Sequence, residues 1–188
     1  MNISTQQLAA ACDCGIMRAQ NWTQAINDAL RQFAIDAPVR AAAFLAQVAH
    51  ESNRLQFVRE IWGPTGAQRG YEGRRDLGNT EPGDGMRFLG RGLLQVTGRG
   101  NYRLMRDKLR SLMPGVPDFE TAPTALEVPR WAAMSAGAFW DTHRLNDLAD
   151  AGAFEALTRR INGGLNGIED RLALWERARN ALGNGVTT

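Results

Sequence analysis

The chain has 188 residues, of which 22 are basic and 20 acidic, so its formal net charge is only +2. Apolar residues make up 44% and charged residues 22%, which is typical of a globular domain with a real core. This weak charge gives no reason to expect a nucleic-acid partner, and no run of about 20 apolar residues predicts a membrane anchor. We expect a single domain, 1–188, that acts as a monomer and has no linker to a second domain.

The cysteines and histidines exclude several chemistries. Cys12 and Cys14 are separated by one residue, a spacing that rarely meets disulfide geometry, so we expect free thiols and a reducing site of synthesis. A Cys/His peptidase that uses one of them with His50 has no supporting signature. The other histidine is His143, and HExxH, P-loop and dinucleotide motifs are absent, so we expect no metal and no cofactor. The N-terminal stretch also lacks the basic and apolar regions of a secretion signal.

The first third of the chain carries helical patterns. Ser4 and Gln7 form a capping-box pattern that opens a short helix. A second helix is indicated by apolar residues at helical spacing, namely Trp22, Ile26, Leu30 and Phe33. Asp36 and Pro38 mark the start of a third helix. The apolar stripe of that third helix consists of Ala41, Phe44, Leu45 and Val48.

The middle of the chain is irregular. Residues 62–87 hold seven glycines and two prolines with little periodicity, which predicts a functional loop or a smaller inserted lobe. Residues 88–96 fit either a short strand or a buried turn, and residues 101–112 again show a helical pattern. A loop with four prolines spans 114–129, and an Ala-rich helix is expected over 130–142.

The final helix is expected to open at Asn166, with Glu169 three residues later as its capping partner. Just before it, the stretch INGGL places Asn162 beside two glycines, and Gly163 fits a helix C-cap. Arg171 flanks the apolar stripe of the final helix, so its side chain either extends to water or pairs with a buried carboxylate.

Glu51 is the strongest candidate for a catalytic group. It follows Phe44 by seven residues and Val48 by three, so it shares their helical face. Apolar surroundings favour the protonated form of a carboxyl group, which is the form that a general acid needs. The alternative is a helix-end glutamate that points to water.

Glu60 lies nine residues after Glu51. On one continuous helix the two side chains would face opposite sides, roughly 13.5 Å apart along the axis. A catalytic pair therefore requires the helix to end between them, and Ser52 and Asn53 are plausible exit residues because both are poor in helix interiors. Two carboxylates that flank a glycosidic bond are the minimum machinery for its hydrolysis.

The stretch GRGLLQVTGRGNY, from Gly90 to Tyr102, combines polar and apolar residues with four glycines. Gln95 and Thr97 would share one face of an extended segment, and Asn101 follows. Amides and hydroxyls at fixed spacing suit sugar hydroxyls and N-acetyl groups, while glycines allow close backbone approach. An edge strand with ordinary polar alternation is the alternative.

Three separated blocks of the sequence resemble glycoside hydrolase family 19. They are FLAQVAHES, YEGRRDLGNTEPGDGMRFLGRGLLQVTGRGNY and INGGLNGIEDR, within a match from about Ala37 to Arg179. The family includes plant chitinases and the endolysins of phages and prophages, and the second block is most similar to the endolysins. The resemblance implies a mainly α, lysozyme-like fold with two lobes, a cleft between them and a small Gly-rich lobe.

The resemblance also implies inverting hydrolysis of β-1,4 bonds between N-acetylated aminosugars, and it assigns roles to residues. Glu51 matches the general acid, Glu60 the general base, and Thr97 a residue that helps to hold the attacking water. Glu72 and Glu81 compete with Glu60 for the role of base. The expected substrate-binding residues are His50, Tyr71, Gln95, Asn101, Tyr102, Asn162 and Arg171, and Arg171 is expected to pair with one of the carboxylates.

These expectations favour an endolysin that hydrolyses peptidoglycan. Such a protein would be made in the host cytoplasm and would act on the wall from the periplasm after the membrane is permeabilised, without a separate wall-binding domain. A chitinase, a catalytically inactive carbohydrate-binding module and a wall-degrading toxin are the alternatives. An inactive module is disfavoured because binding alone requires no acid/base pair.

Overall fold

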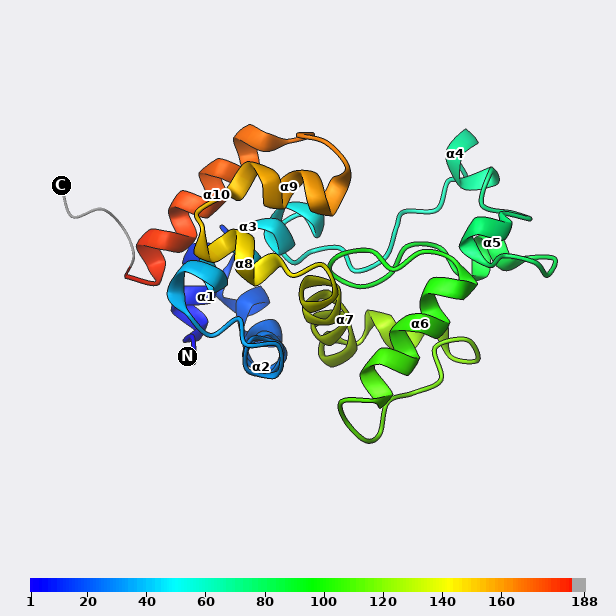
Figure 1. Ribbon diagram of the computed structural model, residues 1–188, viewed down its shortest axis with the longest axis horizontal. Coiled ribbons are helices and arrows are strands. Elements are labelled where there is room, and N and C mark those ends of the chain that lie inside the picture. Colours follow the sequence, from blue (N-terminus) through cyan, green and yellow to red (C-terminus); the bar gives the residue numbers. More distant parts are fainter. Residues whose placement is uncertain (184–188) are drawn as a thin grey trace.

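The computed structural model describes residues 1–183 and is mainly helical. Figure 1 shows its elements, which are α1 (Thr5–Ala11), α2 (Ile16–Gln32), α3 (Pro38–Glu51), α4 (Gly66–Arg69), α5 (Asp84–Arg87), α6 (Arg99–Arg110), α7 (Pro129–Thr142), α8 (Leu145–Asp150), α9 (Phe154–Asn162) and α10 (Ile168–Ala181). Two short 3₁₀ helices are η1 (Arg75–Leu77) and η2 (Pro123–Glu127). Extended pairing among the described residues is limited to isolated bridges of Arg91 with Arg59 and with Val96. None of the described helices is long and apolar enough to cross a membrane.

Most of the apolar core belongs to the helices at one end of the molecule. Figure 1 shows α1 to α3 and α8 to α10 gathered there, α4 to α6 at the other end, and α7 between the two groups. The residues of α3 from Ala41 to Ala49 are all buried, and α3 packs mainly against α10. A helix that is apolar on every side must be enclosed by others. α3 is therefore a rigid central support for whatever its C-terminal end carries.

Most of the expected helices are confirmed. The capping box of Ser4 and Gln7 opens α1, and Pro38 occupies the first turn of α3 after the N-cap residue Ala37. The predicted start of the final helix at Asn166 was wrong, because the N-cap is Gly167 in a left-handed conformation with φ 70°. The carbonyl of Asn166 instead accepts a hydrogen bond from Arg171 Nε at 3.1 Å. Cys12 and Cys14 are free, as expected.

The stretch expected to form the smaller lobe, residues 62–87, contains α4, η1 and α5. It packs closely against the start of α6, where Gly98 has φ +93° and a Cβ atom would lie 2.6 Å from the carbonyl oxygen of Leu77. Only glycine fits such an approach. The exact division into lobes stays a prediction.

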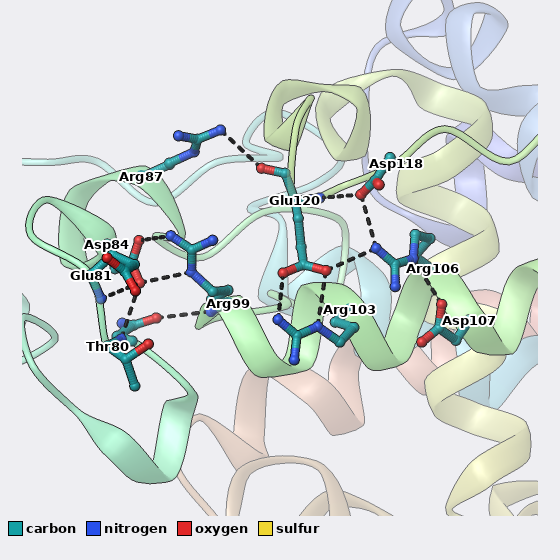
Figure 2. Close-up of polar contacts among 11 residues, drawn as sticks. Thr80, Glu81, Asp84, Arg87, Arg99, Arg103, Arg106, Asp107, Asp118 and Glu120 are labelled. Carbon is teal, nitrogen blue, oxygen red and sulfur yellow. Dashed lines mark hydrogen bonds and ion pairs between the residues drawn. The ribbon is translucent and has the colours of Figure 1, made fainter.

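Ion pairs connect α5, α6 and the loop before η2, as Figure 2 shows. Asp84 accepts hydrogen bonds from the backbone N–H groups of Thr80 and Glu81 and from the guanidinium of Arg99. The Asp84 side chain is only 2% exposed. Arg99 is the main cause that holds the pKa of Asp84 below its ordinary value. Nearby, Arg103 and Arg106 of α6 both bind the carboxylate of Glu120.

Candidate active site

The required break between Glu51 and Glu60 is present, and it is an abrupt one. α3 ends at Glu51, and Ser52 is its buried C-cap residue. The next three residues, Asn53, Arg54 and Leu55, have φ angles of 47°, 60° and 61°. A left-handed conformation costs roughly 1–2 kcal/mol for each residue that is not glycine. Three in succession persist only where the surroundings enforce them.

Ser52 supplies much of that enforcement. Its Oγ donates to the carbonyl oxygen of Val48 at 2.6 Å and accepts from the backbone N–H of Leu55 at 2.9 Å. The Leu55 side chain is buried in the core, and the backbone N–H of Arg54 donates to Ala49 at 2.7 Å. The prediction that the helix ends near Ser52 or Asn53 is confirmed. The turn directs the chain sharply away from the axis of α3, so that Glu60 pairs with the backbone of Gly90.

Glu51 is held by an arginine from α10. Arg171 Nη2 donates to Glu51 Oε1 at 2.5 Å, while Arg171 Nη1 donates to Gln47 Oε1. Gln47 Nε2 in turn donates to Thr158 Oγ1 at 2.8 Å. The side chain of Arg171 is 2% exposed and that of Glu51 is 25% exposed. The expected pairing of Arg171 with a carboxylate is therefore confirmed, and it fixes one oxygen of a group that still reaches solvent.

A second contact joins the end of α3 to α10. His50 Nδ1 lies 2.6 Å from Asp170 Oδ2, and Arg54 Nη1 donates to the same oxygen at 2.9 Å. Arg54, followed by His50, lowers the pKa of Asp170 despite its partial burial. The imidazole also lies against Gly167, where a Cβ atom would be 2.3 Å from His50 Cε1. These contacts hold the His50 side chain against Gly167 and Asp170. That His50 contacts substrate stays a prediction.

Glu60 is held by three donors. Its own backbone N–H donates to the carbonyl oxygen of Gly90 at 2.8 Å, and the N–H of Gly90 donates to Glu60 Oε2 at 3.2 Å. Oε1 accepts hydrogen bonds from Gln68 Nε2 at 2.9 Å and from the Tyr71 hydroxyl at 3.3 Å. Burial first, and then the neighbouring Glu60 carboxylate, raises the pKa of Tyr71. Tyr71 therefore stays a donor to Glu60 at neutral pH.

Gln68 is a site residue that the sequence analysis missed. Its side chain is buried, and its Oε1 accepts from the backbone N–H groups of Gly63 and Thr65. Its Nε2 donates both to Glu60 and to the carbonyl oxygen of Ile61 at 2.8 Å. Thr65 and Gln68 form a capping box around α4. The T-x-x-Q spacing was the available signal in the sequence.

The side chains of Gln95 and Thr97 meet at Gly90, whose backbone N–H donates to Glu60. A Cβ atom on Gly90 would lie 2.2 Å from Gln95 Oε1 and 3.2 Å from Thr97 Oγ1. The two side chains do share a location, but residues 88–96 form a turn with isolated bridges, and Gln95 itself is left-handed with φ 49°. Asn101 follows in α6 and donates to the carbonyl oxygen of Thr97 at 2.7 Å. Because Gly90 has no side chain, Gln95 and Thr97 can approach its backbone, and the N–H of that backbone donates to Glu60.

Tyr102 and Asn162, two further expected substrate-binding residues, are also held by internal partners. Tyr102 is fully buried, donates to Leu89 O at 2.6 Å and accepts from Arg91 Nη1 at 2.9 Å. Its assignment as a substrate contact was wrong, because a fully buried phenol with both contacts satisfied supports the turn from within. Asn162 Nδ2 donates to Asn166 O at 3.2 Å, in the loop between α9 and α10. Gly163 is the left-handed C-cap of α9, as predicted.

The competing glutamates have different surroundings from Glu60. Glu72 Oε1 accepts from the backbone N–H of Gly83 at 2.7 Å, and Oε2 accepts from that of Gly85 at 2.8 Å. Both of its oxygens therefore hold the backbone around α5. Glu81 is exposed, and its backbone N–H donates to Asp84. Of the three, Glu60 is the one that accepts a hydrogen bond from Gly90, the residue at which Gln95 and Thr97 meet.

A pocket of about 540 Å³ extends from Gln95 and Thr97 along α6 and α7. Its lining residues are Leu94, Gln95, Val96, Thr97, Asn101, Leu104, Met105, Lys108, Ser135, Phe139, Thr142 and His143. Three of the predicted site residues, Gln95, Thr97 and Asn101, thus line one pocket. Two of them, Gln95 and Thr97, meet at Gly90, whose N–H donates to Glu60.

No protein-family model matches the chain. A curated relative is the glycosyl hydrolase family 19 domain-containing protein of Haemophilus influenzae, which is 37% identical over 110 residues. That alignment covers 58% of this chain and 50% of the relative, so the chain matches about half the length of that protein.

Two solved structures have a similar fold. Chitinase C from Streptomyces griseus HUT6037 aligns with a TM-score of 0.74 and 22% identity, over 97% of this chain and 77% of that one. A bacterial family 19 chitinase aligns with a TM-score of 0.72 and 23% identity, over 96% and 95% of the two chains. The expected resemblance to glycoside hydrolase family 19 is confirmed, and the chain has the mainly helical, lysozyme-like fold of the family 19 chitinases.

Proposed function

We propose that the protein is a glycoside hydrolase that cuts β-1,4 bonds between the N-acetylated aminosugars of peptidoglycan by inversion. The observation that carries this proposal is the way the two carboxylates are held. Glu51 stands at the end of a rigid helix and is oriented by Arg171, while Glu60 is held by Gly90, Gln68 and Tyr71 next to Gln95 and Thr97. Two carboxyl groups with different surroundings are what acid/base hydrolysis of a glycoside requires.

In this mechanism Glu51 is the acid. Its Oε1 is fixed by Arg171, whereas Oε2 has no hydrogen bond to any other group in residues 1–183. Oε2 is therefore the oxygen that would carry the proton to the leaving glycosidic oxygen. Once the proton has left, the guanidinium of Arg171 stabilises the remaining carboxylate.

Glu60 is the base. Its donors, the Gly90 N–H, the Gln68 amide and the Tyr71 hydroxyl, match the acceptor-only character of an ionised carboxylate. Thr97 Oγ1 lies close to Gly90, whose backbone N–H donates to Glu60. Thr97 and Glu60 would together hold the attacking water. The water would attack the sugar from the face opposite the leaving group, which inverts the anomeric carbon.

Chitin is the competing substrate, because both solved neighbours are chitinases by name. Chitin is neutral, whereas peptidoglycan carries lactyl and peptide carboxylates. The exposed Arg59, which adjoins Glu60 in the chain, is a cationic side chain that favours the wall polymer. We therefore place peptidoglycan first.

The test uses purified wall and, separately, chitin, each incubated with the wild type and with Glu51→Gln. We expect the wild type to release new sugar reducing ends from the wall, and mass spectrometry identifies the sugar at each end. N-acetylmuramic acid ends indicate a muramidase and N-acetylglucosamine ends a glucosaminidase. Wild-type turnover by Glu51→Gln, or release of peptides without sugar ends, would refute the proposal, while turnover of chitin alone would replace the substrate.

The choice of base needs its own comparison. Glu60→Gln should abolish turnover, whereas Glu81→Gln, at an exposed site, should retain it. Glu72→Gln is a less clean control because Glu72 holds two backbone N–H groups, so its thermal midpoint must be measured beside its activity. Loss of turnover in Glu81→Gln with normal turnover in Glu60→Gln would show that the base is misassigned.

We further propose that the protein serves as an endolysin, which is made in the cytoplasm and reaches the wall after the membrane is permeabilised. Expression in a bacterial cytoplasm should leave growth unchanged until a membrane-permeabilising agent is added, and the culture should then lyse. Lysis that depends on Glu51 but requires no permeabilisation would contradict this role. Growth inhibition relieved by a specific co-expressed inhibitor protein would favour a toxin.

A further inference from the structure

The pocket described above is a trough between α6 and α7, and among the proposed catalytic residues Glu51, Glu60 and Thr97 it is Thr97 that lines it, at one end. That end holds Gln95 and Thr97, together with Ser135, whose Oγ would lie 2.8 Å from a Cβ atom on Gly92. At the other end Lys108 of α6 forms an ion pair with Asp141 of α7, with Nζ and Oδ2 2.9 Å apart.

Both helices run along the trough, which fixes its length. Lys108 follows Asn101 by seven residues, and that step corresponds to roughly 10 Å along a helix. About three residues of extended peptide span the same distance. The trough therefore extends from Gln95 and Thr97 over roughly 10 Å, a length that suits a short peptide.

The floor of the trough is apolar for most of this length. Its apolar lining residues are Leu94, Val96, Leu104, Met105 and Phe139. Leu104 is 67% exposed, although it is a large apolar side chain in the middle of a regular helix. An exposed apolar surface that continues a binding site is typical of a place that a ligand covers.

A sugar chain does not match this floor. A sugar carries polar substituents around its ring, and the aliphatic side chains of Leu94, Val96 and Leu104 offer these groups no hydrogen-bond partner. A lactyl group followed by small amino acids instead presents methyl groups at short intervals and ends in carboxylates. Lys108 and His143 stand where such carboxylates would arrive, and His143 is braced by stacking on Phe139 with ring centroids 3.9 Å apart.

We propose that this trough binds the lactyl-linked peptide of the wall polymer, while Gln95, Thr97 and Asn101 bind the sugar that carries it. The inference rests on the proposed function and extends it, because it explains how one site would distinguish peptide-bearing glycan from chitin. Leu104 and Lys108 are then residues that determine specificity and take no part in bond cleavage.

The test compares intact wall glycan with the same glycan after an amidase has removed its peptides. Leu104→Asp introduces a negative charge that repels carboxylates and makes the apolar floor of the trough hydrophilic. Leu104 is exposed, so the fold should tolerate the change. Leu112→Asp is the matched control, since Leu112 is 41% exposed and lies just beyond α6, outside the trough. We expect Leu104→Asp to lower kcat/KM on intact glycan about tenfold and to leave peptide-free glycan within about twofold. Leu112→Asp should change neither.

An equal loss on both substrates, or no loss on either, would overturn the inference. Absence of turnover by the wild type on both glycans would instead refute the proposed function, so the two failures are distinguishable. Thermal midpoints of the variants show whether each is folded.

A binding measurement tests the trough without any variant. The probe is synthetic lactoyl-alanyl-isoglutamine, added to the wild type carrying labelled methionine methyl groups. Met105 lines the trough, whereas Met17 is 72% exposed on α2 and serves as an internal control. We expect the Met105 methyl resonance to shift on titration and that of Met17 to stay in place. Unchanged Met105 at millimolar peptide would contradict the proposal.

Discussion

The two ends of the molecule are stabilised in different ways, and each provides one carboxylate. The larger group of helices buries α3 among apolar side chains, and Glu51 stands at the end of that helix. The region around α4 to α6 combines buried side chains such as Phe88 and Leu109 with glycines, capping side chains and ion pairs, and Glu60 is held beside it by neutral donors. The proposed acid is thus oriented by a rigid helix and a buried cation, and the proposed base by a network of polar contacts.

The largest expected effect concerns the carboxylates themselves. Replacing either one, as in Glu51→Gln or Glu60→Gln, should lower kcat on wall glycan by about 10³-fold, which is typical of the loss of a general acid or base. Glu60→Gln should leave the thermal midpoint within a degree or two, whereas Glu51→Gln should lower it, because it leaves the buried Arg171 without a charged partner. Reducing-end release measures the activity. A folded variant of either kind that keeps a tenth of the activity would contradict the assignment of separate acid and base.

The second effect tests the helix-bound half of the comparison. Arg171→Met removes a buried cation that holds Glu51 and Gln47, and we expect a loss of about 3 kcal/mol in the free energy of unfolding together with a fall in kcat. Urea unfolding measures the first quantity. Arg159→Met, at an exposed position of α9, is the control and should change neither. Normal activity in Arg171→Met would show that Glu51 needs no positioning.

The third effect tests the polar half. Asp84→Asn should cost about 2 kcal/mol of stability at pH 7, because it weakens contacts with Arg99 and two backbone N–H groups. Since the pKa of Asp84 is lowered in the folded state, its contribution is fully present above the ordinary value of 3.8. The contribution is lost as pH falls through the lower, folded pKa.

The difference in unfolding free energy between wild type and Asp84→Asn should therefore shrink as the pH falls below 3.8. Hydrogen exchange should show the loss first at α5 and the start of α6, since proteins open in local units. A difference independent of pH, or one spread evenly over α3 and α10, would contradict the separate stabilisation of the two regions.

The smallest effect sharpens the description of the base. Tyr71→Phe removes one of three donors to Glu60 and should lower kcat about tenfold with little change in stability. Gln68→Ala, which removes a buried donor that also holds Gly63 and Thr65, should lower both kcat and the thermal midpoint. If the two variants behave alike, the network around Glu60 is not organised as described.

Periodicity sufficed to predict most of the helices, because their apolar stripes and the capping box at Ser4 act locally. It also gave the geometric requirement that the chain turn between Glu51 and Glu60. It did not predict three left-handed residues at 53–55, because these depend on Ser52 and on the burial of Leu55 in the folded protein.

The site was harder to predict where a role depends on long-range contacts. Tyr102 matched a family motif, yet its burial beneath Arg91 and Leu89 is a property of packing, which spacing does not reveal. Gln68 was missed for the opposite reason, since its local capping pattern was visible but its contact with Glu60 was not. The helix start at Asn166 failed because Gly167 adopts a left-handed conformation against His50.

The central claim is that Glu51 and Glu60 act as acid and base on opposite faces of the sugar. The most direct measurement is ¹H NMR of the products in the first minutes of glycan cleavage, before the new reducing ends equilibrate. The account predicts that cleavage of a β-linked substrate yields the α-anomer first, with no signal from Glu51→Gln. Initial release of the β-anomer would show retention through a covalent intermediate and would contradict the account.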